Sequence, residues 1–194
     1  IIGPFDDKIL EIDELGIPGE HNLQNFLAAS TCSHLMGISQ NQIVRTLKEF
    51  KGVEHRLEYV RTINEVEYIN DSKATNINSV IVAISTYDQP IVLILGGFNK
   101  GANFRLLLPH IKSSHVRDIV SYGDAGGQIN TALGDAVRSV QVTDLSSAVK
   151  KAQLMAAPGD IVLLSPGCAS FDEFSNFEER GNHFKSIIKS IAIS

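Results

Sequence analysis

Short, mostly apolar runs alternate with helical segments through the second half of this sequence. The runs lie at residues 91–95, 116–122, 139–142 and 161–164. Segments with helical spacing of apolar residues lie between and after them, at 104–111, 128–133, 146–156 and 176–191. Strands that are apolar on both faces are typical of a parallel sheet covered by helices on both sides. The alternation therefore predicts a doubly wound, mostly parallel α/β sheet.

The segments before this alternation follow other patterns. Two β-rich stretches, 57–63 and 66–69, flank Asn64-Glu65 and predict a hairpin. Further upstream, apolar residues at near-helical spacing predict two helices, 20–35 and 39–50. A hairpin leading into the parallel strands would add an antiparallel edge to the sheet.

These patterns divide the chain into two predicted domains. Residues 56–194 are expected to form a complete α/β domain, and residues 1–55 a helix pair at the tail of a domain whose main body lies elsewhere. Within that tail, prolines and glycines in residues 1–18 favour a hairpin or an irregular lead-in. The sequence opens on two isoleucines rather than a methionine, which we interpret as a piece of a longer protein.

The composition excludes several classes of protein. The 194 residues carry 17 Lys and Arg against 22 Asp and Glu, and 43% are hydrophobic, which is typical of a folded globular chain. The Lys and Arg residues form no basic stripe, so nucleic acid is not an expected partner. No run approaches the ~18 apolar residues of a membrane span. Two cysteines, Cys32 and Cys168, are too few for a disulfide scaffold, so we expect reduced thiols and a cytoplasmic protein.

Ligands of an open parallel sheet bind at the carboxyl ends of its strands, where the loops of this sequence are unusual. The loop after residue 69 places Asp, Ser, Lys and Thr in the turn before a helix, where free N–H groups favour an anion. Lys73 and Thr75 are suited to hold a phosphate or a carboxylate, with Asp71 orienting the lysine or a ribose hydroxyl. The alternative is that Asp71, Ser72 or Thr75 caps the helix.

Two further loops carry candidate side chains. The glycine-rich loop after residue 95 does not follow the G-x-x-x-x-G-K-[ST] pattern of nucleotide-binding phosphate loops. Its Lys100 either binds a substrate carboxylate or is a solvated lysine on a turn. In the loop after residue 164, we expect Ser170 to donate a hydrogen bond to a ligand carboxylate, and Cys168 to be buried and unreactive. Phe171 and Phe177 either wall this site or pack in the core.

Two polar pairs upstream are ambiguous. His55-Arg56, at the predicted domain junction, suits a phosphate or an aromatic base, or is a surface pair at a linker. Asn22 and Asn25, three residues apart on one helix face, either read a purine edge or cap the start of the helix. The histidines form no H-x-x-x-H or comparable cluster, so we expect no metal site built by this chain.

Taken together, five segments resemble the Mur ligase family, and most specifically its D-glutamate-adding branch. The segments are H-N-x-x-N at 21–25, F-K-G-V-E-H-R-L-E at 50–58, Y-I-N-D-S-K-A-T-N at 68–76, L-G-G-x-x-K at 95–100, and the run L-S-P-G-C-A-S-F-D-x-F-x-N-F-E-x-R-G at 164–181. The resemblance implies the C-terminal part of a three-domain, ATP-dependent ligase. Its Rossmann-like domain would bind the amino acid and follow the tail of the central ATPase domain.

The resemblance further implies the reaction and its partners. The amine of D-glutamate would be joined to the alanine carboxylate of UDP-N-acetylmuramoyl-L-alanine through an acyl phosphate made from ATP. The phosphate loop, the Mg²⁺ ligands and the UDP-binding domain of the family have no counterpart in these residues, so we expect the chain alone to be inactive. We also expect the protein to be a monomer. The alternative is a free-standing α/β module that binds a nucleotide or an acidic amino acid without catalysis.

The resemblance also assigns roles to single residues. The implied ATP contacts are Asn22, Asn25, His55, Arg56, Asp71 and Lys73. Three of these six are also implied to be catalytic: Lys73, His55 and Arg56. The implied D-glutamate contacts are Thr75, Lys100, Ser170, Phe171 and Phe177. No metal ligand is implied.

Overall fold

Residues 10–17 and 20–192 are described by a computed structural model of the chain. The chain divides into two compact units, Ile1–Gly52 and Val53–Ser194. No helix in the described ranges is long and apolar enough to cross a membrane. That the first unit is the tail of an ATP-binding domain stays a prediction.

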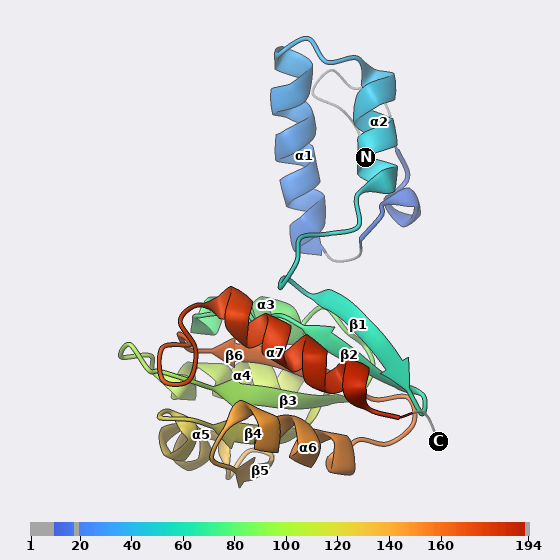
Figure 1. The fold of residues 1–194 in the computed structure, drawn as a ribbon. Helices are drawn as coiled ribbons and strands as arrows, with labels where there is room; N and C mark the ends of the chain where they lie inside the picture. Colours follow the sequence, from blue (N-terminus) through green and yellow to red (C-terminus); the bar gives the residue numbers. More distant parts are fainter. Residues whose placement is uncertain (1–9, 18–19, 193–194) are drawn as a thin grey trace. The chain divides into compact units, whose positions relative to one another are not determined.

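The first unit is a helix pair with a small core of its own. Its elements are a 3₁₀ turn η1 (Ile12–Glu14), helix α1 (Glu20–Leu35) and helix α2 (Gln40–Glu49) (Figure 1). Both predicted helices are confirmed. The side chains buried between the elements are Leu10, Phe26, Ile43 and Leu47. Of the predicted lead-in, residues 10–17 form the 3₁₀ turn and its flanks rather than a hairpin, and residues 1–9 and 18 lie outside the described residues.

The second unit contains a six-stranded sheet with the order β1-β2-β6-β3-β4-β5. Its strands are β1 (Glu58–Ile63), β2 (Val66–Asn70), β3 (Ile91–Gly96), β4 (Val116–Tyr122), β5 (Arg138–Gln141) and β6 (Ile161–Gly167). β1 and β2 form the predicted antiparallel hairpin, and the other neighbouring strands are parallel. Asn64 and Glu65 at the hairpin turn have φ of 50° and 61°, as a type I′ turn requires. The predicted mostly parallel sheet is confirmed.

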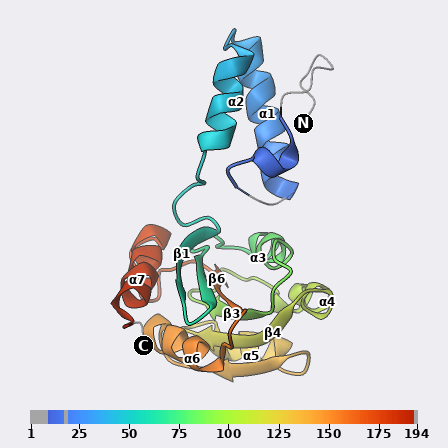
Figure 2. The ribbon, with the colours of Figure 1, turned by 90° about the vertical axis from the view of Figure 1, so that its right-hand side faces the viewer.

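Helices cover both faces of this sheet (Figures 1 and 2). On one face lie α3 (Ile77–Ile84), α4 (Leu108–Ser113), which follows a 3₁₀ turn η2 (Phe104–Leu107), and α5 (Gly126–Leu133). On the other face lie α6 (Leu145–Met155) and α7 (Phe177–Ser190). Right-handed crossovers explain this division, because β2, β3, β4 and β5 follow one another in one direction, whereas the chain runs back from β5 to β6.

This reversal determines where a ligand can bind. The loop after β3 leads to α4 on one face, and the loop after β6 leads to α7 on the other. Because the two strands are neighbours, the loops that follow them start side by side at the carboxyl ends of the strands and then run to opposite faces of the sheet. In doubly wound folds such a switch point is where ligands bind.

A charged network lies at the amino-terminal ends of the parallel strands. Asp118 on β4 is buried and accepts hydrogen bonds from Arg138 Nη2 at 2.8 Å and Arg117 Nε at 3.0 Å. Arg117 also pairs with Asp160, at 2.8 Å, just before β6. The hydrogen bond from Arg138 holds the pKa of Asp118 below its usual range. These bonds join β4, β5 and β6 at the end away from the candidate site, so we interpret them as structural.

Candidate ligand-binding site at the carboxyl ends of the strands

Three strand-end loops that the sequence singles out lie against one another. The first follows β2, the second follows β3 and the third follows β6, and β6 lies between β2 and β3 in the sheet. Phe98 and Ala169 form an isolated antiparallel bridge between the second and third loops, with N–H to O distances of 2.9 and 3.1 Å. Gly167 N, at the end of β6 where the third loop begins, donates to Ala74 O of the first loop at 2.8 Å. The backbone therefore places Lys73, Thr75, Lys100 and Ser170 on loops that touch.

The segment before β1 contacts the first loop. His55 adopts a φ of 65°, and its carbonyl oxygen accepts a hydrogen bond from Lys73 N at 3.0 Å. The His55 ring is buried and meets the Phe177 ring edge-on at 6.1 Å between centroids. Lys73 Nζ lies 5.8 Å from the Phe177 centroid, in cation–π range. His55, Lys73 and Phe177 thus form one cluster, while Arg56 beside them is exposed.

Hydrogen bonds define which ring nitrogen of His55 carries the proton. Asn70 Oδ1 accepts from Ser72 N at 3.1 Å, so the amide nitrogen of Asn70 is the group that faces His55 Nδ1, at 3.0 Å. That nitrogen also donates to Glu58 Oε2 at 2.9 Å. Nδ1 therefore accepts, and in the neutral ring the proton lies on Nε2. In this arrangement His55 offers a ligand a hydrogen-bond donor rather than a base.

Asp71 is buried at the centre of the first loop. Its Oδ1 accepts from Leu57 N at 3.2 Å, and its Oδ2 accepts from Ser165 Oγ at 2.8 Å. Burial raises the pKa of Asp71 to about 7, although both hydrogen bonds oppose the shift. The carboxylate thus connects β6 to the segment before β1, which is a structural role that the sequence pattern alone did not predict.

Asp71 should make the stability of the second unit pH-dependent. Its folded-state pKa of about 7 lies above its ordinary value of 3.8, so between these values the folded chain binds more protons than the unfolded one. This contribution to stability is present at low pH and is lost as the pH rises through about 7. In Asp71→Asn the amide can still accept from Leu57 N, and Ser165 Oγ can turn to accept. Urea unfolding from pH 5 to 8 should show the variant gaining stability relative to the wild type as pH rises; a constant difference would contradict the assignment.

Lys100 and Phe171, two of the predicted D-glutamate contacts, lie together in the structure. Lys100 Nζ is 4.9 Å from the Phe171 centroid, and both side chains are exposed. Ser170, the neighbour of Phe171, is buried, whereas Thr75 on the first loop is exposed. Phe171 is 59% exposed and therefore is not a core residue. Cys168 is buried, and burial raises the pKa of its thiol to about 12, which agrees with the unreactive cysteine expected.

Asn22 and Asn25 belong to the other unit. Both lie on α1, at spacing that places them on one helix face. Asn25 is exposed and Asn22 is partly buried. Their predicted contact with a purine therefore stays a prediction.

Arg180 is a residue of this region to which sequence reasoning gave no role. It lies on α7 and is completely buried beneath the first and third loops. A signal was available in the sequence, because Arg180 falls in the same helical stripe as the buried Phe184 and Ile188. A charged residue in an apolar stripe indicates either a buried partner or a functional position.

Glu54, His55 and Glu58 bring three potential metal-ligand atoms within 4.8 Å of one another. Lys185 on α7, however, pairs with both carboxylates, at 3.2 Å for Glu58 Oε1 and at still closer range for Glu54. The Lys185 ammonium group contacts both acids and offsets one of their two negative charges. We interpret this group as an ion-pair network that joins α7 to the start of β1.

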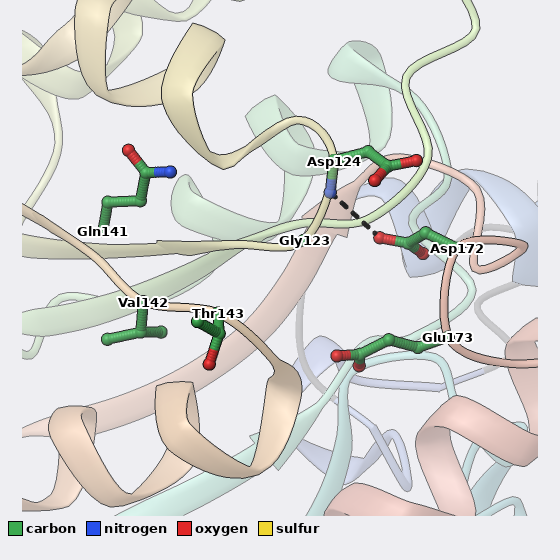
Figure 3. A pocket seen from close by; sticks show the side chains of 7 residues that line it. All are labelled: Gly123, Asp124, Gln141, Val142, Thr143, Asp172 and Glu173. Atoms are coloured by element: carbon green, nitrogen blue, oxygen red, sulfur yellow. Dashed lines mark hydrogen bonds between the residues drawn. The ribbon is translucent and has the colours of Figure 1, made fainter.

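A cavity of about 600 Å³ opens farther along the same edge, at the ends of β4 and β5 (Figure 3). It is lined by Gly123, Asp124, Gln141, Val142, Thr143, Asp172 and Glu173. Asp172 accepts from Asp124 N at 3.3 Å, and Glu173 from Leu145 N at 3.2 Å. These acids therefore already bind backbone N–H groups at the starts of α5 and α6. None of the residues predicted from sequence lines this cavity.

The fold and the loops define a class: a doubly wound α/β domain with lysine and hydroxyl side chains on its strand-end loops. Residues 55–168 match the family described as Mur ligase, glutamate ligase domain. The chain belongs to this family, as its motifs suggested.

Relatives of known name agree with this assignment. The UDP-N-acetylmuramoylalanine–D-glutamate ligase of Pelotomaculum thermopropionicum is 48% identical over 187 residues, which cover 95% of this chain and 41% of that protein. The ligase of the same name from Salinibacter ruber is 41% identical over 96% of this chain and 40% of that protein. The chain therefore spans about two fifths of the length of the curated relatives it matches.

Solved structures share the fold at lower identity. UDP-N-acetylmuramate-alanine ligase MurC from Thermotoga maritima aligns with a TM-score of 0.67 and 17% identity over 91% of this chain and 39% of that one. Folylpolyglutamate synthase from Mycobacterium tuberculosis, solved with ADP, aligns with a TM-score of 0.67 and 13% identity over 93% of this chain and 42% of that one. At these identities the comparison concerns the fold alone.

Proposed function

We propose that this chain is the amino-acid-binding, C-terminal part of a UDP-N-acetylmuramoylalanine–D-glutamate ligase. The observation that carries the proposal is the meeting of three strand-end loops that bring Lys73 and Lys100 to one edge of the sheet. Neither lysine forms an ion pair within 4.0 Å in the part of the chain that the structure describes. Exposed cations on neighbouring loops suit a ligand with several negative charges. The identity to named relatives supports the choice of reaction.

The reaction proposed is the formation of an amide. An oxygen of the alanine carboxylate would form a bond with the γ-phosphorus of ATP while the bond from that phosphorus to the β-phosphate oxygen breaks, which gives an acyl phosphate and releases ADP. The amine nitrogen of D-glutamate then forms a bond with the acyl carbon, the bond from that carbon to the phosphate oxygen breaks, and phosphate and a proton leave. Lys73 is the residue proposed to stabilise negative charge on phosphate, with His55 Nε2–H and Arg56 as further donors. Asp71, Asn22 and Asn25 complete the proposed nucleotide contacts.

The amino acid would be bound on the other side of the site. Lys100 is proposed to pair with a carboxylate of D-glutamate, and Ser170 and Thr75 to donate hydrogen bonds to its oxygens. Phe171 and Phe177 would limit the pocket. D-glutamate has two carboxylates, which a lysine and hydroxyl groups are suited to bind.

Mg²⁺ does not fit the carboxylates of Glu54 and Glu58 at the start of β1. Mg²⁺ prefers an octahedron of oxygen ligands, whereas Glu54 and Glu58 surround an ammonium group and a buried imidazole. These residues are therefore not proposed to hold a metal ion in the reaction.

The proposed partners are UDP-N-acetylmuramoyl-L-alanine, D-glutamate and ATP. The cytoplasmic location and the monomeric state stay predictions.

The 194-residue chain alone is expected to show no ATP-dependent amide formation. It contains no G-x-x-x-x-G-K-[ST] segment to hold the phosphates of ATP. The measurement is phosphate release in the presence of ATP, UDP-N-acetylmuramoyl-L-alanine and D-glutamate, with the intact ligase as the positive control. Turnover by the chain alone would contradict this prediction.

The alternative of a free-standing binding module is decided by the complete reading frame. An upstream phosphate loop supports the ligase, and a native start at Ile1 supports the module. Binding separates the two further, because only the ligase requires discrimination between D-glutamate and L-glutamate. Titration of the isotope-labelled chain with each enantiomer would show shifts at Lys100 and Ser170 for the D form if the proposed pocket is correct.

A further inference from the structure

Arg180 is the largest completely buried side chain among the described residues. Its guanidinium group donates to two neighbouring loops. Nε donates to Ser72 Oγ at 2.9 Å and Nη2 to Ser72 O at 2.8 Å. Nη1 donates to Cys168 O and Ala169 O, both at 3.1 Å. One planar group thus connects the loop after β2 to the loop after β6.

The second loop of the site, which follows β3, also approaches this group. A Cβ placed on Gly97 would lie 3.1 Å from Arg180 Nη1 and 2.3 Å from Ala169 O. Gly97 has a φ of 118°, so glycine is required there for both backbone and space. The guanidinium group therefore lies where the loops after β2, β3 and β6 meet.

The charge of Arg180 has no acidic partner in the described ranges. No carboxylate there lies within 4.0 Å of the guanidinium group, and its acceptors are three carbonyl oxygens and one hydroxyl. A buried charge without a direct ion pair is costly, and the carbonyl dipoles and the more distant Glu173 offset only part of that cost. A sequence keeps such a cost most often where function requires it.

Arg180 contacts the two residues that directly precede candidate ligand contacts in the sequence. Ser72 precedes Lys73, and Ala169 precedes Ser170. Ser72 Oγ in turn donates to Phe177 O at 2.8 Å, so the start of α7 is held by the same bonds. A change at Arg180 would therefore move Lys73 and Ser170 relative to each other without removing either.

We infer that Arg180 is the positioning residue of this site. It holds the loop that carries Lys73 against the loop that carries Ser170, and it places a buried positive charge behind the bound anions. The identity of those anions rests on the proposed function, whereas the positioning of the loops does not.

The first test measures the loops directly in the 194-residue chain. Hydrogen exchange would be compared for wild type, Arg180→Met and Arg180→Lys. Losing the bonds should raise exchange about tenfold or more in residues 71–75 and 168–171 of Arg180→Met, with little change in β4. Arg180→Lys keeps the charge but cannot reach all four acceptors, so an intermediate effect is expected. Arg180→Lys also provides the comparison with the wild type if Arg180→Met fails to fold.

The matched control is Arg138→Met, which breaks the ion pair with Asp118 at the opposite edge of the sheet. It makes the same change of residue type and should lower stability without selective exchange in the two loops. Equal exchange changes in Arg180→Met and Arg138→Met, or a uniform increase over all strands, would overturn the inference.

The second test uses kinetics of the intact ligase. Arg180→Met should raise KM for D-glutamate about tenfold to hundredfold and leave KM for UDP-N-acetylmuramoyl-L-alanine near the wild-type value. Arg180→Lys should recover part of the loss, and Arg138→Met should leave both constants unchanged. Unaltered KM for D-glutamate in Arg180→Met would contradict the positioning role. Absence of ligase activity in the wild type would instead refute the proposed function, and the exchange test would still judge Arg180.

Discussion

Gly181→Ala is expected to destabilise the second unit by about 3 kcal/mol, because it forces a methyl group into a buried polar contact. A Cβ at this position of α7 would lie 2.2 Å from His55 Nδ1 and 3.1 Å from Asn70 Nδ2. Neither neighbour is the flexible end of a long side chain. The methyl group would separate His55 from Asn70 and leave their 3.0 Å hydrogen bond broken.

The measurement is the free energy of unfolding of each variant in urea, monitored by a spectroscopic signal of the α/β sheet. Gly127→Ala is the matched control, because its Cβ would meet only the side chain of Gln141, at 3.7 Å. Gly127 lies in the first turn of α5, where alanine should be neutral or slightly stabilising. Similar losses in the two variants would show that the contact between α7 and His55 is not as tight as described.

Lys100→Ala in the intact ligase is expected to raise KM for D-glutamate roughly tenfold to hundredfold, as loss of a charge-assisted hydrogen bond would. Lys100 lies on the glycine-rich loop after β3, and its Nζ lies over the Phe171 ring. It has no carboxylate partner in the ranges described. Because Lys73 is on a different loop, KM for ATP should change little. Steady-state kinetics with each substrate varied in turn gives the comparison.

The control for Lys100 is Lys112→Ala, which removes an exposed lysine from α4. It makes the same change in net charge, so any general effect of charge on substrate approach is shared. An equal rise of KM for D-glutamate and for ATP in Lys100→Ala would place Lys100 outside the amino-acid pocket.

Much of the fold follows from local patterns. The hairpin turn at Asn64-Glu65 and the apolar run in β3 are recognisable because side-chain pattern and turn chemistry agree. Boundaries were less accurate where glycine or proline lies at an element's end. The predicted helix 104–111 is a 3₁₀ turn followed by α4, with Pro109 in the first turn of α4, where its missing N–H is tolerated.

Strand β6 shows a limit of local reasoning. The sequence predicts an end at residue 164, because Pro166 and Gly167 follow. In the structure the strand continues to Gly167, which pairs with Gly96 of β3. A neighbouring strand, and not the local sequence, supports these last residues.

The candidate site divides in the same way. Lys73, Lys100 and Ser170 were recognisable because the carboxyl ends of parallel strands are where ligands bind, whatever the strand order. The internal roles of Asp71 and His55 were not, since their partners Ser165 and Asn70 are recognised only when the loops are placed.

The sequence by itself determined a doubly wound sheet, the loops that carry its chemistry and the family that shares them. Only the tertiary structure decided that Arg180 is buried without an ion pair to any described carboxylate, and that Lys185 pairs with both Glu54 and Glu58. The physical reason is the strand order, in which β6, the last strand, lies between β2 and β3. That order brings residues about a hundred positions apart into contact, such as Ser72 and Arg180, and no local pattern records such a pairing.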